Sequence, residues 1–187
     1  MRLSIVGDSH AKRIRNHHAT STDTVTIKSI PGLKWIDTHD KSLSLLHLLF
    51  SSELQQLLSV SDSLVFIIGT NSVRIFHARH IIQQIEEIIF VLRHSYTQLN
   101  QPNKISILLS FPCIKTTRRF PTKSSLISNI QLYNRLLCKS AIRMTFNAID
   151  FPLLEYHLTN DRIHLRRHVY RRLFSFLMTY FNQSKHQ

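Results

Sequence analysis

The sequence predicts an α/β protein in which a parallel β-sheet is covered by helices on both faces. Short apolar runs alternate along the chain with longer segments in which apolar residues recur at the helical period, a pattern typical of repeated β-α units. Two runs, at residues 64–68 and 105–111, are nearly continuously apolar, as strands buried on both faces require. The length of 187 residues and the apolar content of 43% suit one domain with its own hydrophobic core.

Five strands and four helices are expected. The strands are Leu3–Val6, Val25–Ile30, Leu64–Ile68, Ile105–Phe111 and Thr145–Ile149. The helices are Leu43–Leu58, Val73–Leu99, Ser125–Ile142 and Leu165–Tyr180. The last helix carries an apolar stripe that would dock on the sheet, made of Leu165, Val169, Leu173, Phe176, Leu177 and Tyr180.

Residues suited to catalysis follow several of the expected strands. These segments are Gly7-Asp8-Ser9-His10, Pro31-Gly32, Gly69-Thr70-Asn71-Ser72 and, after the fifth strand, Asp161-Arg162-Ile163-His164. They contain all three glycines of the chain. Because the carboxyl ends of parallel strands meet at one edge of the sheet, where ligands bind, we expect these segments to form one site.

Ser9, His164 and Asp161 have the chemistry of a catalytic triad. A serine at a tight strand-to-helix turn exposes its hydroxyl at the sheet edge, but it is a weak nucleophile until a base accepts its proton. His164 can be that base if the last loop folds over the first. Asp161, three residues before His164, can fix the tautomer of the imidazole and stabilise its protonated form.

Three groups from three loops could stabilise the oxyanion of an acyl intermediate. They are the backbone N–H of Ser9, the backbone N–H of Gly32 and the side-chain amide of Asn71. Each residue taken alone also has a simpler interpretation: Ser9 and Asp161 as helix N-caps, and Asn71 as a turn residue. Those interpretations do not explain why such residues, with every glycine of the chain, follow successive strands.

Together these residues resemble the SGNH hydrolases, also called GDSL-type esterases and lipases. The four blocks of that family match in order: Gly7-Asp8-Ser9, Gly32, Gly69-x-Asn71 and Asp161-x-x-His164. The resemblance implies a flavodoxin-like fold with strand order 2-1-3-4-5 and hydrolysis of acyl or acetyl esters without a metal or other cofactor. It also implies that Ser9, Gly32, Asn71 and His164 are the residues that give the family its name.

The chain departs from the family pattern at two positions beside the expected site. The leucine that usually follows the serine is His10, and the aspartate that often follows the asparagine of the third block is Ser72. Neither change removes a catalytic group. His10 either lines the site and contacts the substrate, or covers the first helix.

The chain is strongly basic, with a formal net charge of +13, and therefore attracts polyanions. Lys115, Arg118 and Arg119 lie in an expected loop at residues 112–124, after the fourth strand, and Arg166, Arg167, Arg171 and Arg172 follow His164. These side chains are either solvated surface charges or contacts for an anionic substrate, an anionic membrane or nucleic acid. A catalytically silent module that binds RNA or anionic lipid is therefore the alternative to an esterase.

Other features constrain the setting of the protein. Cys113 and Cys138 show no disulfide or metal-site pattern and are expected to be free thiols. The chain contains no apolar run long enough to span a bilayer and no signal-peptide pattern, so we expect an intracellular protein. Domains resembling SGNH esterases occur in proteins of some retrotransposons, a setting compatible with the basic composition.

Overall fold

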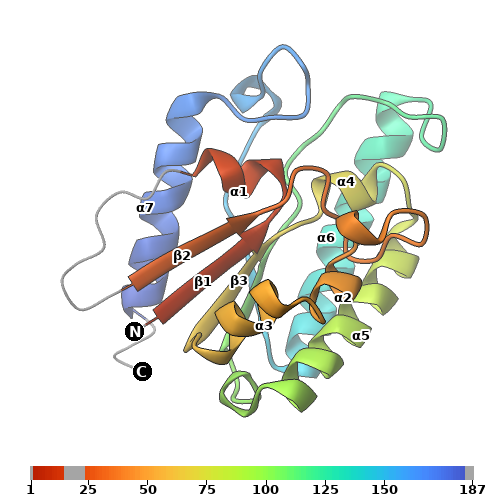
Figure 1. Ribbon diagram of the computed structural model, residues 1–187. Helices are drawn as coiled ribbons and strands as arrows, with labels where there is room; N and C mark the ends of the chain where they lie inside the picture. The colour runs from red at the N-terminus through yellow and green to blue at the C-terminus, as the bar shows by residue number, and fades with distance from the viewer. Residues whose placement is uncertain (1, 15–23, 184–187) are drawn as a thin grey trace.

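A five-stranded parallel sheet forms the centre of the molecule. The computed structural model describes residues 2–14 and 24–183. The strands lie in the order β2-β1-β3-β4-β5, and every neighbouring pair is parallel. Their bounds are β1 Arg2–Gly7, β2 Thr24–Ser29, β3 Ser63–Ile67, β4 Ile105–Leu108 and β5 Asn147–Ile149. The expected fold class and strand order are confirmed (Figure 1).

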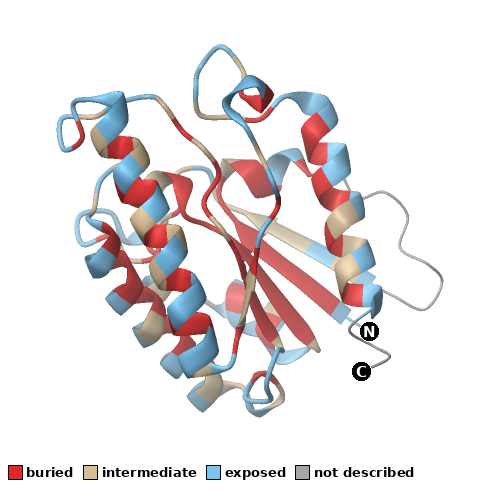
Figure 2. Cartoon of the chain, turned by 180° about the vertical axis from the view of Figure 1, so that it is seen from behind, coloured by how far each residue is buried: buried red, intermediate tan, exposed pale blue. Residues whose placement is uncertain are grey.

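Helices cover both faces of this sheet. α1 (Ser9–Arg13) and α7 (Arg167–Gln183) pack on one face, and the other face is covered by α2 (Leu45–Leu48), α3 (Ser52–Ser59), α5 (Ala78–Ser95) and α6 (Lys123–Met144) (Figure 1). Successive residues of β3 enter opposite cores, with Leu64 and Phe66 on the α5 side and Val65 and Ile67 on the α7 side. The central strands are therefore buried between two layers of helix, as Figure 2 shows.

The prediction of one continuous helix at Leu43–Leu58 is wrong. The segment instead forms a 3-10 turn at Lys41–Leu43, then α2 and α3. Ser51 separates the two helices, because its hydroxyl donates to the carbonyl of Leu48 (2.7 Å) and accepts the N–H of Leu54 (3.4 Å). It thereby caps the start of α3.

The expected helix Val73–Leu99 is also interrupted. It consists of α4 (Thr70–Val73), α5, and a 3-10 turn at Thr97–Leu99. The buried side chain of Asn129, from α6, fills the gap between α4 and α5. Its oxygen accepts the N–H of Ala78 (2.8 Å), and its nitrogen donates to the carbonyls of Val73 (2.8 Å) and Phe76 (2.9 Å). The backbone groups freed by the break are thus satisfied.

Several ends of elements differ from expectation. β5 begins at Asn147 rather than Thr145, because Thr145 takes a left-handed conformation (φ 54°) that ends α6. β4 ends at Leu108, before the expected Phe111. Leu165 precedes α7 and forms an antiparallel bridge with Leu158. A third 3-10 turn spans Glu155–His157.

Among the described helices, none has the length and apolar character needed to cross a membrane.

Candidate active site

Ser9 lies at the turn between β1 and α1, as the sequence predicts. The turn is tight: a Cβ at Gly7 would lie 2.6 Å from the Cβ of Ala11 and 2.7 Å from the carbonyl oxygen of Ile67, so only glycine fits there without movement. Asp8 caps α1 by accepting the N–H of His10 (2.9 Å). Ser9 is the first residue of α1, where backbone N–H groups have no partner within the helix.

The structure joins Ser9, His164 and Asp161 by hydrogen bonds. The Ser9 hydroxyl lies 2.9 Å from Nε2 of His164, and Nδ1 of His164 lies 2.5 Å from a carboxylate oxygen of Asp161. The first distance connects residues 155 positions apart in the chain. A proton can therefore pass from the serine hydroxyl to the imidazole, whose other nitrogen is held by a carboxylate.

A short hairpin holds the aspartate and the histidine. The second oxygen of Asp161 accepts the N–H groups of Ile163 and His164 (both 2.9 Å) and the hydroxyl of Thr159 (2.7 Å). Partial burial alone would raise the pKa of Asp161, but the hydrogen bonds from His164, Ile163 and Thr159 outweigh burial and hold this pKa well below its ordinary value. The carboxylate therefore stays ionised beside the imidazole.

Gly32 and Asn71 lie together near the first loop. Gly32 has φ +86° in a turn closed by a hydrogen bond from the N–H of Leu33 to the carbonyl of Ile30 (3.0 Å). This bond leaves the N–H of Gly32 outside the turn. The amide of Asn71 donates to Asp8 (3.3 Å) and to the carbonyl of Leu33 (3.4 Å). Asn71 thus connects the loops after β1 and β2.

Asp8 is a buried carboxyl group, which the motif before Ser9 does not indicate. It is 1% exposed, and burial raises its pKa to about 7, although the N–H of His10 favours the ionised form. Its partners are backbone and amide N–H groups. A buried Asp before a serine has no distinct sequence signal, because Asp is equally common as an exposed helix cap.

His10 is enclosed beside the triad. The residue is 1% exposed, and its ring packs against the ring of Phe111 at 4.9 Å and lies 5.4 Å from that of His164. Its Nδ1 is 2.9 Å from the hydroxyl of Tyr170 on α7. Nothing in the sequence distinguished Tyr170 from an ordinary core tyrosine of that helix.

The basic residues after β4 lie on the surface. Lys115, Arg118 and Arg119 are exposed. Burial raises the pKa of the Cys113 thiol in the same loop, and Asp161 adds to this rise while Lys115 opposes it. The backbone of this loop is tied to the triad hairpin by the N–H of Ile114, which donates to the carbonyl of Arg162 (3.1 Å). Within the described residues no hydrogen bond or ion pair connects Arg118 or Arg119 with the triad.

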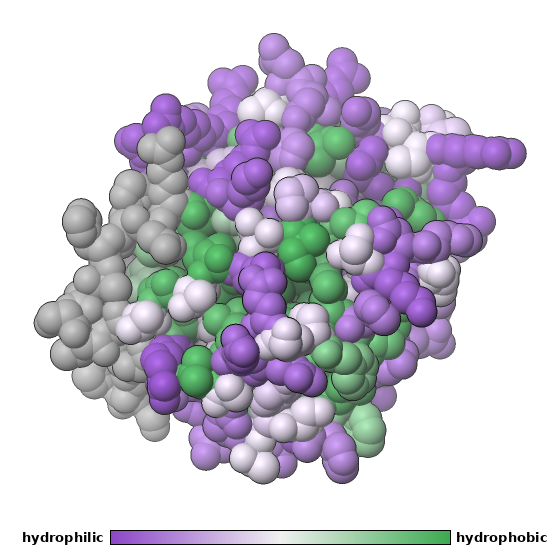
Figure 3. Space-filling model, in the orientation of Figure 1, coloured by the Kyte–Doolittle hydropathy of each residue, from purple (hydrophilic) through white to green (hydrophobic). Residues whose placement is uncertain are grey.

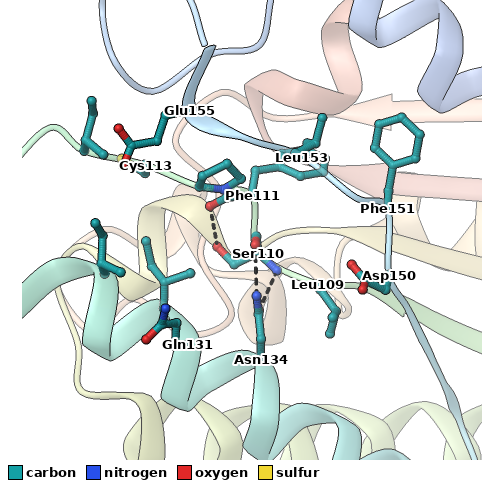
Figure 4. A pocket seen from close by; sticks show the side chains of 14 residues that line it. Leu109, Ser110, Phe111, Cys113, Gln131, Asn134, Asp150, Phe151, Leu153 and Glu155 are labelled. Carbon is teal, nitrogen blue, oxygen red and sulfur yellow. Dashed lines mark hydrogen bonds between the residues drawn. The ribbon is translucent and has the colours of Figure 1, made fainter. Parts of the chain in front are cut away.

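A pocket of about 260 Å³ opens at the ends of β4 and β5 (Figure 4). Its walls come from the loop after β4, from α6 and from the segment after β5. They combine the apolar side chains of Phe111, Ile114, Ile127, Phe151 and Leu153 with the polar side chains of Gln131, Asp150 and Glu155. Asn134 fixes the floor by bonding the N–H (2.9 Å) and the carbonyl (3.2 Å) of Ser110. No sequence pattern indicated this pocket.

Both cysteines are free, and no metal-binding cluster occurs among the described residues.

Comparison with solved structures shows that esterases share this fold. No protein-family model matches the sequence, and no curated protein sequence matches it either. A carbohydrate acetylesterase family member from Sinorhizobium meliloti superposes with a TM-score of 0.72 at 18% identity, covering 98% of each chain. The native aryl esterase of M. smegmatis gives 0.69 at 12% identity, covering 97% of this chain and 98% of that one.

A third similar structure is the lipase/acylhydrolase of Enterococcus faecalis, with a TM-score of 0.63, 13% identity, and coverage of 98% of this chain and 97% of that one. At such identities the likeness concerns the fold. The chain has, over nearly its whole length, the fold of these esterases and acylhydrolases.

Proposed function

We propose that this protein is a serine hydrolase that cleaves carboxylic esters, with Ser9 as the nucleophile, His164 as the general base and Asp161 as the orienting carboxylate. The observation that carries the proposal is the continuous chain of hydrogen bonds from the Ser9 hydroxyl through His164 to Asp161. The shared fold with esterases and acylhydrolases supports it.

In the proposed reaction, His164 takes the proton of Ser9 as the serine oxygen attacks the ester carbonyl. The N–H groups of Ser9 and Gly32 and the amide of Asn71 stabilise the oxyanion. The oxyanion replaces the carbonyl of Leu33 as a partner of Asn71, a contact of 3.4 Å. The protonated imidazole then gives its proton to the departing alcohol, and water, activated by the same histidine, hydrolyses the acyl-enzyme.

The pocket beside the triad hairpin suits the apolar part of the ester. It lies at the same sheet edge as Ser9, and its wall residue Ile114 is bonded through its N–H to Arg162, within the hairpin. Apolar walls gain free energy from burying an alkyl or aryl group. We propose that the preferred esters carry such a group.

The decisive experiment tests Ser9 directly. A fluorophosphonate should label the wild-type protein at Ser9, and the wild type should hydrolyse p-nitrophenyl acetate at least a hundredfold faster than Ser9→Ala. Ser128→Ala, at an exposed position of α6, is the matched control and should retain wild-type activity. Equal rates for wild type and Ser9→Ala, with no labelling, would reject the proposal.

A basic surface supports a second candidate function, the binding of RNA or anionic lipid. Lys115, Arg118, Arg119, Arg162 and Arg167 are exposed on segments at the carboxyl edge of the sheet. None of them forms an ion pair within residues 2–14 and 24–183. Hydrophilic side chains project from the upper edge of the molecule in Figure 3.

This second function is tested by binding at two salt concentrations. The apparent affinity for an RNA oligonucleotide or for phosphatidylserine vesicles should fall steeply between 50 and 200 mM salt, by roughly tenfold or more. Arg118→Glu combined with Arg119→Glu should weaken binding, while labelling of Ser9 stays unchanged. Binding that is independent of salt and of these two charges contradicts the idea.

A further inference from the structure

A buried chain of hydrogen bonds runs beside the triad and connects the neighbours of its two reacting residues. The N–H of Leu165 donates to the hydroxyl of Tyr170 (3.2 Å), and this hydroxyl lies 2.9 Å from Nδ1 of His10. His10 directly follows Ser9, and Leu165 directly follows His164. Ser9 and His164 are therefore joined twice, once by their own contact and once through this second chain.

The direction of these hydrogen bonds follows from counting donors and acceptors. Within the described residues, Nε2 of His10 has no partner. If the hydroxyl of Tyr170 donates to Nδ1, the Nε2–H of His10 is the only unpaired group. If Nδ1–H donated instead, both the tyrosine proton and the Nε2 lone pair would lack a partner. Because buried unpaired groups are costly, Tyr170 donates and His10 is the neutral Nε2–H tautomer.

The surroundings keep the side chains of His10 and Tyr170 uncharged. Burial, followed by the nearby charges of His164 and Arg13, lowers the pKa of His10 to about 3, against a smaller opposing influence of Asp161. Burial raises the pKa of Tyr170 to about 12, with smaller influences of the Leu165 N–H, Arg13, Asp8 and Asp161. Neither group gains or loses a proton near neutral pH. The chain of hydrogen bonds therefore keeps the same form while His164 accepts and returns its proton.

The packing around His10 makes this connection rigid. Its ring meets Phe111 edge to face at 4.9 Å, and Tyr170 is 3% exposed. Leu165 is also held by its bridge to Leu158. A shift of the hairpin that moved His164 away from Ser9 would have to break the bond between Leu165 and Tyr170.

We propose that His10 and Tyr170 are positioning residues that hold the His164 ring within hydrogen-bond reach of Ser9. The inference rests on the proposed esterase function. Neither residue touches substrate, and both act through the hairpin that carries His164. An aliphatic side chain at position 10 could not accept the proton of Tyr170.

The test compares variants that keep or remove the two hydrogen bonds. Tyr170→Phe and His10→Leu should each lower kcat about tenfold with KM changed less than twofold, because small displacements of a catalytic base reduce the rate strongly. His10→Asn, whose amide oxygen can take the place of Nδ1, should recover at least half of wild-type kcat. Tyr156→Phe, at an exposed tyrosine, is the control and should leave kcat unchanged.

Nuclear magnetic resonance supplies a readout that needs no catalysis. The ring nitrogens of His10 in the wild type should show the Nε2–H tautomer unchanged between pH 5 and 9. The amide of Leu165 should exchange with solvent at least tenfold faster in Tyr170→Phe than in Tyr156→Phe. Titration of His10 in that pH range, or unchanged exchange of Leu165, would overturn the inference even in an inactive protein.

The outcomes separate the two proposals. A wild type without activity or labelling rejects the esterase function, while the resonance measurements still decide on the hydrogen-bond chain. An active wild type with kcat unchanged in Tyr170→Phe and in His10→Leu rejects the positioning role. If Tyr170→Phe does not fold, the comparison of His10→Leu with His10→Asn decides.

Discussion

Asp161 shows how a surface carboxylate acquires a defined role from its hydrogen bonds. Its side chain is 42% exposed, yet it accepts the imidazole N–H of His164, two backbone N–H groups and the hydroxyl of Thr159. These bonds favour the ionised form and lower its pKa. The same bonds shape the hairpin and orient the imidazole.

Replacing Asp161 by Asn should impair catalysis while leaving the fold intact. The amide nitrogen would favour the wrong tautomer of His164, and kcat should fall by about 10²–10⁴. Steady-state hydrolysis of p-nitrophenyl acetate measures this change. Asp62→Asn, just before the start of β3, should keep wild-type kcat, and an Asp161→Asn enzyme as active as this control would contradict the assigned role.

Asp8 couples stability to pH. In the unfolded chain its carboxyl group ionises near pH 4, whereas in the folded protein burial raises its pKa to about 7. Between these values the unfolded chain releases a proton that the folded protein keeps, so stability is lost as pH rises through this window.

The variant Asp8→Asn cannot ionise at this position and lacks that loss of stability. The Tm of Asp8→Asn minus that of the wild type should therefore become more positive from pH 5 to pH 8. The expected change is about 3 kcal/mol, or roughly 6–12 °C. Thermal unfolding followed by circular dichroism at each pH measures it. If this difference in Tm does not change with pH, the raised pKa of Asp8 is contradicted.

At the scale of elements, the break between α4 and α5 positions part of the site. Asn71 lies in α4, a helix of four residues that is too short to be stable alone. Asn129 of α6 holds the carbonyls of Val73 and Phe76 and the N–H of Ala78 through three hydrogen bonds. The orientation of Asn71 thus depends on a side chain from another helix.

Replacing Asn129 by Leu keeps the branched shape of the side chain but removes these three bonds. The buried backbone groups would lose their partners at a cost of about 1–3 kcal/mol each, partly offset by relaxation. We expect the free energy of unfolding to fall by more than about 2 kcal/mol, measured by urea denaturation. Ser128→Leu, one residue earlier and exposed, should change it far less. Similar free energies of unfolding for the two variants would show that Asn129 does not stabilise the break between α4 and α5.

At the scale of the whole molecule, the sheet edge gathers the nucleophile, the base and the pocket. The hairpin of His164 comes from the segment after β5, an edge strand, and reaches across to Ser9 after β1. The loop after β4 connects the two regions, because it lines the pocket and bonds the hairpin through Ile114. Filling the pocket therefore tests whether it receives substrate.

Ile127→Trp should fill part of the pocket without changing the triad. Relative to the wild type, kcat/KM for p-nitrophenyl hexanoate should fall about tenfold more than kcat/KM for the acetate, because only the longer chain needs the apolar volume. Ile142→Trp, on the exposed side of α6, is the control. If the ratio of kcat/KM for the hexanoate to kcat/KM for the acetate is unchanged, the acyl chain binds outside this pocket.

The elements that periodicity predicted well have a simple burial pattern. β1 and β3 are buried almost throughout, and α6 buries residues at the helical period. All three agree with expectation within one or two residues, because continuous apolar runs and the helical period report burial directly. The break at Ser51 and the break between α4 and α5 were missed. Ser51 bonds backbone groups only three residues away, a local capping contact that a search for the helical period does not detect. The break between α4 and α5 is stabilised by Asn129, whose bond to Ala78 joins residues 51 positions apart and leaves no local pattern.

The sequence by itself determined the fold class, the strand order through its resemblance, and the residues of the candidate triad, because strand ends and glycines mark the loops of a parallel sheet. Tertiary structure alone decided that His10 is enclosed rather than exposed, that Tyr170 bonds it, and that a pocket opens beside the hairpin. The physical reason is that burial and hydrogen-bond partners depend on which distant segments pack together, and that packing is set by the whole molecule.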